Sequence, residues 1–71
     1  MILIFCLFQA ARNGHVPIVR ALVRNKKVNV EINAISNEDK TAVDYADEEF
    51  NSEIVAILRR NKGKKASRVR G

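Results

Sequence analysis

Hydrophobic residues recur along this chain at spacings that predict helices, and the first two helices form a pair. Residues 2–13 have a helix-compatible pattern that stops at Gly14, because glycine adopts the left-handed conformation that ends many helices. A second helix follows, with Pro17 in its first turn and its end near Asn25. Its apolar face consists of Ile18, Val19, Leu22 and Val23.

A second pair of helices is predicted after residue 40. Thr41 begins the first of them, because Thr41 and Asp44 have the spacing of a capping box. Asn51 or Ser52 caps the next helix, whose apolar residues are Ile54, Val55, Ile57 and Leu58. Residues 62–71 follow the helix and are predicted to be disordered.

Residues 26–40 are predicted to be a long loop between the two pairs. Val28, Val30 and Ile32 alternate with polar residues, which is compatible with a short extended arm. Residues 36–39 are typical of a turn. The pattern as a whole predicts an all-α protein with a hairpin-like connection in the middle.

The two helix pairs are copies of one unit. Identical residues recur at an offset of 36 positions, as Ala10 and Ala46, Ile18 and Ile54, Val19 and Val55, Leu22 and Leu58, and Asn25 and Asn61. A fixed offset across two helices indicates a repeated helix–turn–helix unit, and periods of this size are typical of stacked repeats.

The repeated unit resembles the ankyrin repeat. Residues 10–15, followed by Ile18 and Val19, resemble the A-A-x-x-G-H-x-x-I-V signature of that family. Residues 40–46 resemble its G-x-T-P-L-H-x-A motif in the T-A-L-D-x-A variant, and residues 30–34 resemble the stretch before the hairpin tip. The resemblance covers about residues 5–61.

The resemblance implies a short solenoid of two repeats. Its parts are a first helix pair in residues 1–25, a loop in residues 26–40, a second helix pair in residues 41–61, and a basic disordered tail in residues 62–71. The loop is about three residues longer than the usual repeat spacing of the family allows.

Two hairpin and turn positions depart from the family pattern. Asp39 stands where the hairpin tip normally has glycine, and aspartate tolerates positive φ better than most residues, so we expect the turn to form. Phe50 stands where Gly14 stands in the first repeat. Because a left-handed phenylalanine is strained, we expect Asn51 to adopt that conformation instead.

The resemblance to the ankyrin repeat implies that the chain is a non-enzymatic protein–protein interaction module. The family presents its hairpin tips and the ends of its inner helices on one concave face. Carried over to this chain, the protein-binding positions are Arg12, Asn13, Asn37, Glu38, Asp39, Lys40, Glu48 and Glu49. A plain solvated surface would have the same polar composition.

The N-terminal segment is apolar on nearly all sides. Capping repeats usually have a polar outer face, and about three repeats are usually needed for stability. An apolar first helix therefore predicts a missing neighbour, supplied by another chain, a lost N-terminal segment or self-association. The resulting hypothesis is a truncated or fragmentary ankyrin protein that is weakly stable alone. A non-functional gene remnant is another alternative.

Charge is distributed in blocks. The net charge of +5 is the sum of +5 in residues 1–30, −7 in residues 31–58 and +7 in residues 59–71. An alternative function is therefore an electrostatic binder that uses the tail on nucleic acid or an anionic membrane surface. The basic residues of the tail are Arg59, Arg60, Lys62, Lys64, Lys65, Arg68 and Arg70.

Residues capable of catalysis or metal binding do not form a recognisable set. His15 is the single histidine, zinc sites need three or four ligands, and the glycines do not form a phosphate-binding loop. Cys6 is expected to be a small buried hydrophobic residue. We therefore expect no enzymatic activity, no cofactor and no metal.

The location of the protein is expected to be intracellular, and cytoplasmic rather than nuclear. Cys6 is the single cysteine and cannot form an internal disulfide, which fits a reducing compartment. The apolar run of residues 1–8 is far shorter than the roughly 20 residues that span a bilayer. The run also has no basic segment before it, which argues against a secretory signal.

Overall fold

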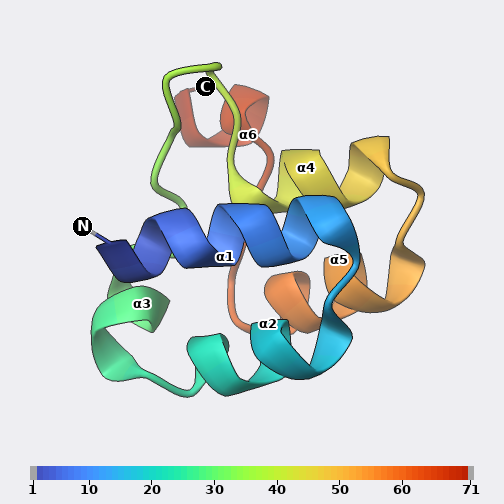
Figure 1. Ribbon diagram of the computed structural model, residues 1–71. Coiled ribbons are helices and arrows are strands. Elements are labelled where there is room, and N and C mark those ends of the chain that lie inside the picture. The colour runs from blue at the N-terminus through green and yellow to red at the C-terminus, as the bar shows by residue number, and fades with distance from the viewer. Residues whose placement is uncertain (1, 71) are drawn as a thin grey trace.

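The computed structural model describes residues 2–70 as a stack of short helices (Figure 1). Met1 of the apolar run, Gly71 and the side chain of Arg70 in the basic tail lie outside the described part. The described residues contain no strand. The helices are α1 (Ile2–Asn13), α2 (Val16–Val23), α3 (Lys26–Val30), α4 (Ala42–Glu48), α5 (Ser52–Arg60) and α6 (Ala66–Arg70).

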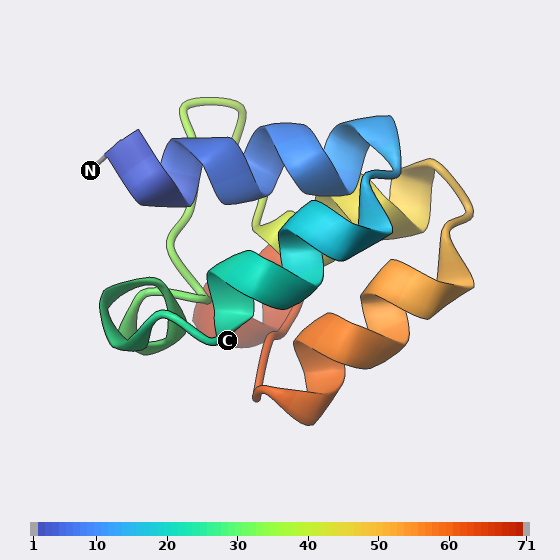
Figure 2. The same ribbon diagram turned by 60° about the horizontal axis from the view of Figure 1, so that its bottom comes forward.

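Helices α1 and α2 form one antiparallel pair, and α4 and α5 form the second. The two pairs lie side by side, with α1 against α4 and α2 against α5 (Figures 1 and 2). Each helix therefore packs on the corresponding helix of the other pair. The predicted all-α stack of two helix–turn–helix units is confirmed.

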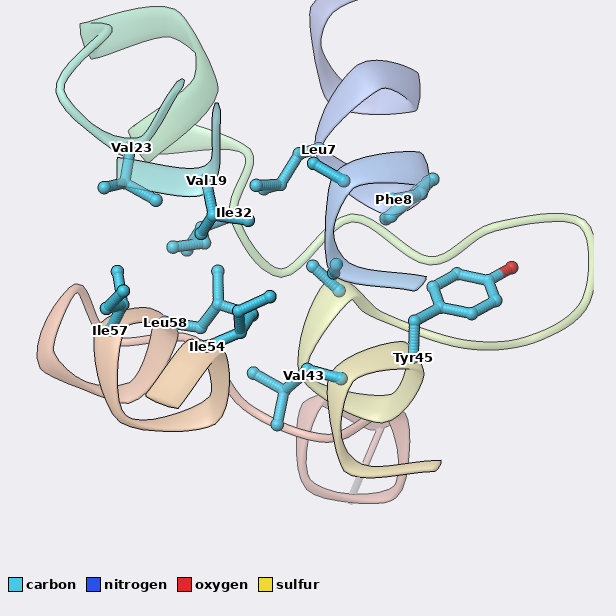
Figure 3. Packing of buried hydrophobic residues seen from close by; sticks show 14 of the residues in the cluster. Leu7, Phe8, Val19, Val23, Ile32, Val43, Tyr45, Ile54, Ile57 and Leu58 are labelled. Atoms are coloured by element: carbon cyan, nitrogen blue, oxygen red, sulfur yellow. The ribbon is translucent and has the colours of Figure 1, made fainter. Parts of the chain in front are cut away.

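The core is the seam between the two pairs. Val19 and Val23 of α2 face Ile54, Ile57 and Leu58 of α5 (Figure 3), and all five side chains are buried. Fully burying such a side chain contributes about 1.5–3 kcal/mol to folding. The shared seam thus stabilises both units at once, as expected for stacked repeats.

The turn within each pair has the same backbone geometry in both copies. The His15 N–H donates to the Ala10 carbonyl oxygen at 3.0 Å, and the Asn51 N–H donates to that of Ala46 at the same distance. Gly14 has φ of 74° and Phe50, its counterpart, has φ of 55°.

The prediction that Asn51 replaces Phe50 in the left-handed conformation is wrong. Asn51 has φ of −91°, and its side-chain oxygen accepts the Ile54 N–H at 3.1 Å as the cap of α5. The repeated turn fixes the conformation at residue 50, so the strain falls on phenylalanine. Phe50 is 93% exposed and is therefore held there without packing.

The long connection begins with a helix, so the prediction of an extended arm over residues 28–32 is wrong. The side chain of Asn25 accepts the N–H groups of Lys27 and Val28, which caps α3. Val28 is fully buried while Val30 is 84% exposed. Ile32, which follows α3, is buried as well. The alternation of hydrophobic residues therefore reflects one turn of helix and the residue that leads out of it, not an extended arm.

The hairpin turn of residues 36–40 forms as predicted. The Ser36 N–H donates to the Lys40 carbonyl oxygen at 2.8 Å. Asp39 has φ of 69°, which confirms that aspartate serves in the place of glycine. Thr41 caps α4 in a complete capping box with Asp44, also as predicted.

The C-terminal segment is docked on the second pair, contrary to the prediction of a disordered tail. The Lys64 N–H donates to Asn33 Oδ1 at 2.6 Å, and the Lys64 carbonyl oxygen accepts the Thr41 hydroxyl at 2.6 Å. The Ala66 N–H donates to Asp44 Oδ2 at 2.8 Å, and Ala66 is buried. These are polar contacts between residues distant in the sequence, which hydrophobic periodicity does not show.

Candidate functional site

A groove lies between α1 and the hairpin loop, on the side of the molecule where the loop projects. Its volume is about 490 Å³. Apolar side chains form much of its lining, and polar side chains flank them. The lining residues are Ile4, Phe5, Phe8, Gln9, Arg12, Ile35, Ser36, Asn37, Glu38 and Tyr45.

Tyr45 connects the hairpin to the helices at this groove. Its hydroxyl donates to Glu38 Oε1 at 2.7 Å and lies 2.8 Å from the Ser36 hydroxyl. Its ring packs against Phe8 with the ring centroids 5.6 Å apart (Figure 3). One side chain therefore fixes both the loop and the floor of the groove.

The charges at the groove shift the titration of Tyr45 and Glu38 in opposite directions. The hydrogen bond from Tyr45 lowers the pKa of Glu38, and the positive charges of Arg12 and Lys40 lower it further. Burial raises the pKa of Tyr45, and its hydrogen bond to Glu38 adds to that increase. At neutral pH the pair is therefore a phenol that donates to a carboxylate.

Two ion pairs lie at or beside the groove. Arg12 Nη1 lies 4.0 Å from Glu38 Oε1, and Lys40 Nζ lies 2.7 Å from Glu48 Oε2. The Lys40 ammonium also lies 5.7 Å from the centroid of the Tyr45 ring. The hydrogen bond to Glu48 raises the pKa of Lys40. The charged side chains are thus largely paired with one another around an apolar floor.

The sequence-predicted binding residues are divided between this groove and the surrounding surface. Arg12, Asn37 and Glu38 line the groove together. The remaining predicted residues, which do not line it, are Asn13, Asp39, Lys40, Glu48 and Glu49. Sequence reasoning missed the apolar floor, above all Phe5, Phe8 and Tyr45, because apolar residues at helical spacing indicate a core rather than a surface.

The open end of the stack is a second distinctive surface. Counterparts at the 36-residue offset differ in burial, since Cys6, Ala21 and Leu22 are exposed or half-buried while Ala42, Ile57 and Leu58 are buried. The first pair covers this side of the second pair, and no described element covers the corresponding side of the first pair. Leu22, which the sequence places on an apolar helix face, is therefore half-buried and packs only against the edge of the core. Cys6 is exposed, contrary to the prediction that it is buried.

The described residues that could take part in catalysis or metal binding do not form a site. His15 precedes α2, and its side chain makes no capping hydrogen bond. Among the described residues, no three or more His, Cys, Asp or Glu side chains cluster in a way that could hold a metal ion. Within the same part of the chain, no helix has the length and apolar character needed to cross a bilayer.

Comparison with known proteins identifies a family. Residues 4–69 match the family model described as ankyrin repeats (3 copies). No curated protein and no solved structure matches the chain. The match extends past α5 into the docked C-terminal segment, and it covers more than half of the chain.

Proposed function

Since the chain belongs to the ankyrin-repeat family, whose repeats are generally protein–protein interaction modules, we propose that it binds a protein partner in the groove between α1 and the hairpin. The family is typically non-enzymatic, and the proposal includes no catalytic step. The observation that carries the proposal is the exposure of an apolar floor beside paired charges.

The floor supplies what a binding site needs and a plain solvated surface lacks. Phe5 is 59% exposed and Ile35 is 37% exposed, and both line the groove. Aromatic side chains in a hollow with a polar rim are typical anchors of protein interfaces. A partner segment with an apolar side chain and hydrogen-bonding flanks fits this arrangement.

The rim also limits which partner fits. Glu38 and Arg12 lie close to each other, and Glu38 accepts the Tyr45 hydroxyl. A charged partner residue would have to compete with these internal contacts. Asn37 and Gln9 are exposed, and their side chains take part in none of the described side-chain hydrogen bonds. We therefore expect a partner that is mainly apolar and uncharged at the point of contact.

We propose in addition that the chain self-associates through the open end of the first pair, face to face. Cys6, Ile18 and Ala21, which are exposed at this end, are uncharged, so two copies can meet there without like-charge repulsion. Stacking head to tail is disfavoured, because Ala11 and Val23 of the seam correspond to Asp47 and Arg59 on the opposite end. An intracellular, cytoplasmic location remains part of the proposal, since Cys6 is an exposed thiol.

Quantitative affinity capture from cell extract tests the groove. The groove variant is Phe5→Ala with Asn37→Ala, and the matched control is Val30→Ala with Glu31→Ala at the exposed end of α3. The proposal expects proteins that the wild type and the control retain equally and the groove variant loses by about tenfold. Equal retention by all three proteins would overturn it.

A further inference from the structure

The docked C-terminal segment holds basic side chains around a second hollow, which the proposed function does not use. The hollow has a volume of about 580 Å³. It lies between the last turn of α5 and the segment that leads into α6. Its lining residues are Arg59, Gly63, Lys64, Lys65, Ser67 and Arg68.

The backbone around this hollow is fixed. Asn33 accepts the Lys64 N–H and its amide donates to the Lys62 carbonyl oxygen at 3.0 Å. Gly63 is buried so closely that an added Cβ would lie 2.8 Å from the Leu58 carbonyl oxygen. The basic side chains of the segment are therefore attached to an ordered backbone. Less backbone entropy is lost when a ligand binds there.

The positive charge in the hollow is only partly balanced by acidic side chains. Lys65 pairs with Asp47 at 3.0 Å. The nearby Asp44 carboxylate accepts the N–H groups of Thr41 and Ala66 through Oδ2. Within the described part of the chain, no ion pair involves Arg59, Lys64 or Arg68.

We propose that this hollow binds a ligand that carries two or more clustered phosphate groups. Arg59, Lys64 and Arg68, which take part in none of the described ion pairs, line one hollow. A phosphate group brings up to two negative charges in a compact tetrahedron, whereas a carboxylate brings one. Arginine side chains bind phosphate oxygens in a bidentate manner, and two of the three cations are arginines. Ser67, which carries a hydrogen-bonding hydroxyl, also lines the hollow.

The residues that line the hollow favour a compact anion over an extended one. Single-stranded nucleic acid is usually held by aromatic stacking, and none of the described residues that line this hollow is aromatic. A flat anionic surface would contact exposed cations wherever they lie, including Arg24 and Arg60 outside the hollow. The phosphate cluster itself is shared by soluble polyphosphates and by phosphorylated lipid headgroups.

The first experiment titrates the full chain with sodium tripolyphosphate by calorimetry at constant ionic strength. The hollow variant is Arg59→Gln with Arg68→Gln, and the control is Arg24→Gln with Arg60→Gln, which removes the same charge outside the hollow. We expect saturable binding that weakens about tenfold or more in the hollow variant and changes less than about threefold in the control. Equal weakening in both variants, or no saturable binding to the wild type, overturns the proposal.

A second measurement locates the ligand and identifies its source. Amide chemical-shift changes on adding tripolyphosphate should centre on Lys64, Ser67 and Arg68; changes spread evenly over all basic residues contradict the proposal. The binding of the chain to vesicles of phosphatidylcholine with phosphatidylinositol bisphosphate is then measured. Vesicle binding that tripolyphosphate displaces would show that the hollow accepts the phosphates of a lipid headgroup. Binding to these vesicles or to duplex DNA that tripolyphosphate does not displace would overturn the proposal in favour of a flat or extended polyanion.

Discussion

Ile18 and Ile54 occupy the same position in the two helix pairs, yet Ile18 is 49% exposed and Ile54 is fully buried. Both follow the turn of their own pair by the same number of residues. Ile54 is covered by the first pair, on the side where α2 packs against α5. The contrast shows that one end of the stack is open. The open end exposes apolar side chains of the kind that are buried in the second pair.

Self-association should follow from this open end. Ile18→Glu places a charge on the open end at a residue that is only half-buried, so it should reduce association while most of the helical content is retained. Size-exclusion chromatography with light scattering at micromolar concentration measures this. The wild type should show a mass that rises with concentration, and the variant should be monomeric; a wild type that is monomeric at every concentration would contradict the proposal.

The strained turn at Phe50 predicts a stabilising substitution. A left-handed conformation costs a non-glycine residue roughly 1–2 kcal/mol, and Phe50 loses almost no packing because its side chain is 93% exposed. Phe50→Gly should therefore raise the free energy of unfolding by up to about 1 kcal/mol once the backbone entropy of glycine is subtracted. Urea denaturation measures the difference.

Two controls accompany that substitution. Phe50→Ala retains the strain and should change stability little, whereas Gly14→Ala introduces the same strain in the first pair and should destabilise by about 1 kcal/mol. A Phe50→Gly variant less stable than the wild type would show that the ring contributes contacts in solution.

Thr41 should connect the capping of α4 to the docking of the C-terminal segment. Its hydroxyl donates to the Lys64 carbonyl oxygen and accepts the Asp44 N–H. Thr41→Val preserves the shape of this fully buried residue but leaves both groups without a partner, which should cost about 1–3 kcal/mol. Ser52→Ala, at the exposed start of α5, should cost less than about 0.5 kcal/mol.

Hydrogen exchange gives the sharper readout of Thr41→Val. The amides of Lys64 and Ala66 should lose protection more than those of α5. If protection falls uniformly, the segment is not held by this hydroxyl.

Acid should weaken the hairpin through Glu38. The pKa of Glu38 in the folded chain is below its ordinary value of 4.5, so its carboxylate favours folding above that pH, and this contribution is lost as the pH falls through the lowered pKa. Between about pH 5 and about pH 3, the free energy of unfolding of Glu38→Gln should therefore fall less than that of the wild type. Urea midpoints across this range test it against Glu49→Gln, whose carboxylate makes none of the described hydrogen bonds or ion pairs; identical pH profiles for both variants would exclude the effect.

The helix pairs could be predicted from the sequence because their cause is local and repeated. Apolar spacing, the capping box at Thr41 and the offset between Ile18 and Ile54 all depend on short segments read one at a time. The left-handed Phe50 could not be predicted from residue preference, because the repeated turn outweighs a cost of roughly 1–2 kcal/mol.

The groove and the hollow could not be predicted from the sequence, because both depend on contacts between residues that are distant in the sequence. The groove needs Tyr45 beside Glu38, and the docked tail needs Lys64 beside Asn33 and Thr41. A charged segment without hydrophobic periodicity is usually disordered, and here main-chain hydrogen bonds to buried or half-buried side chains hold it instead.

A matched pair of truncations tests the stacked arrangement most directly. Under monomeric conditions, Ile54→Ala should lower the free energy of unfolding by about 2–5 kcal/mol, while Ile18→Ala should lower it by less than about 1.5 kcal/mol. Equilibrium urea denaturation of the two variants beside the wild type measures both values. Equal losses, or a larger loss for Ile18→Ala, would contradict a stack that is closed at Ile54 and open at Ile18.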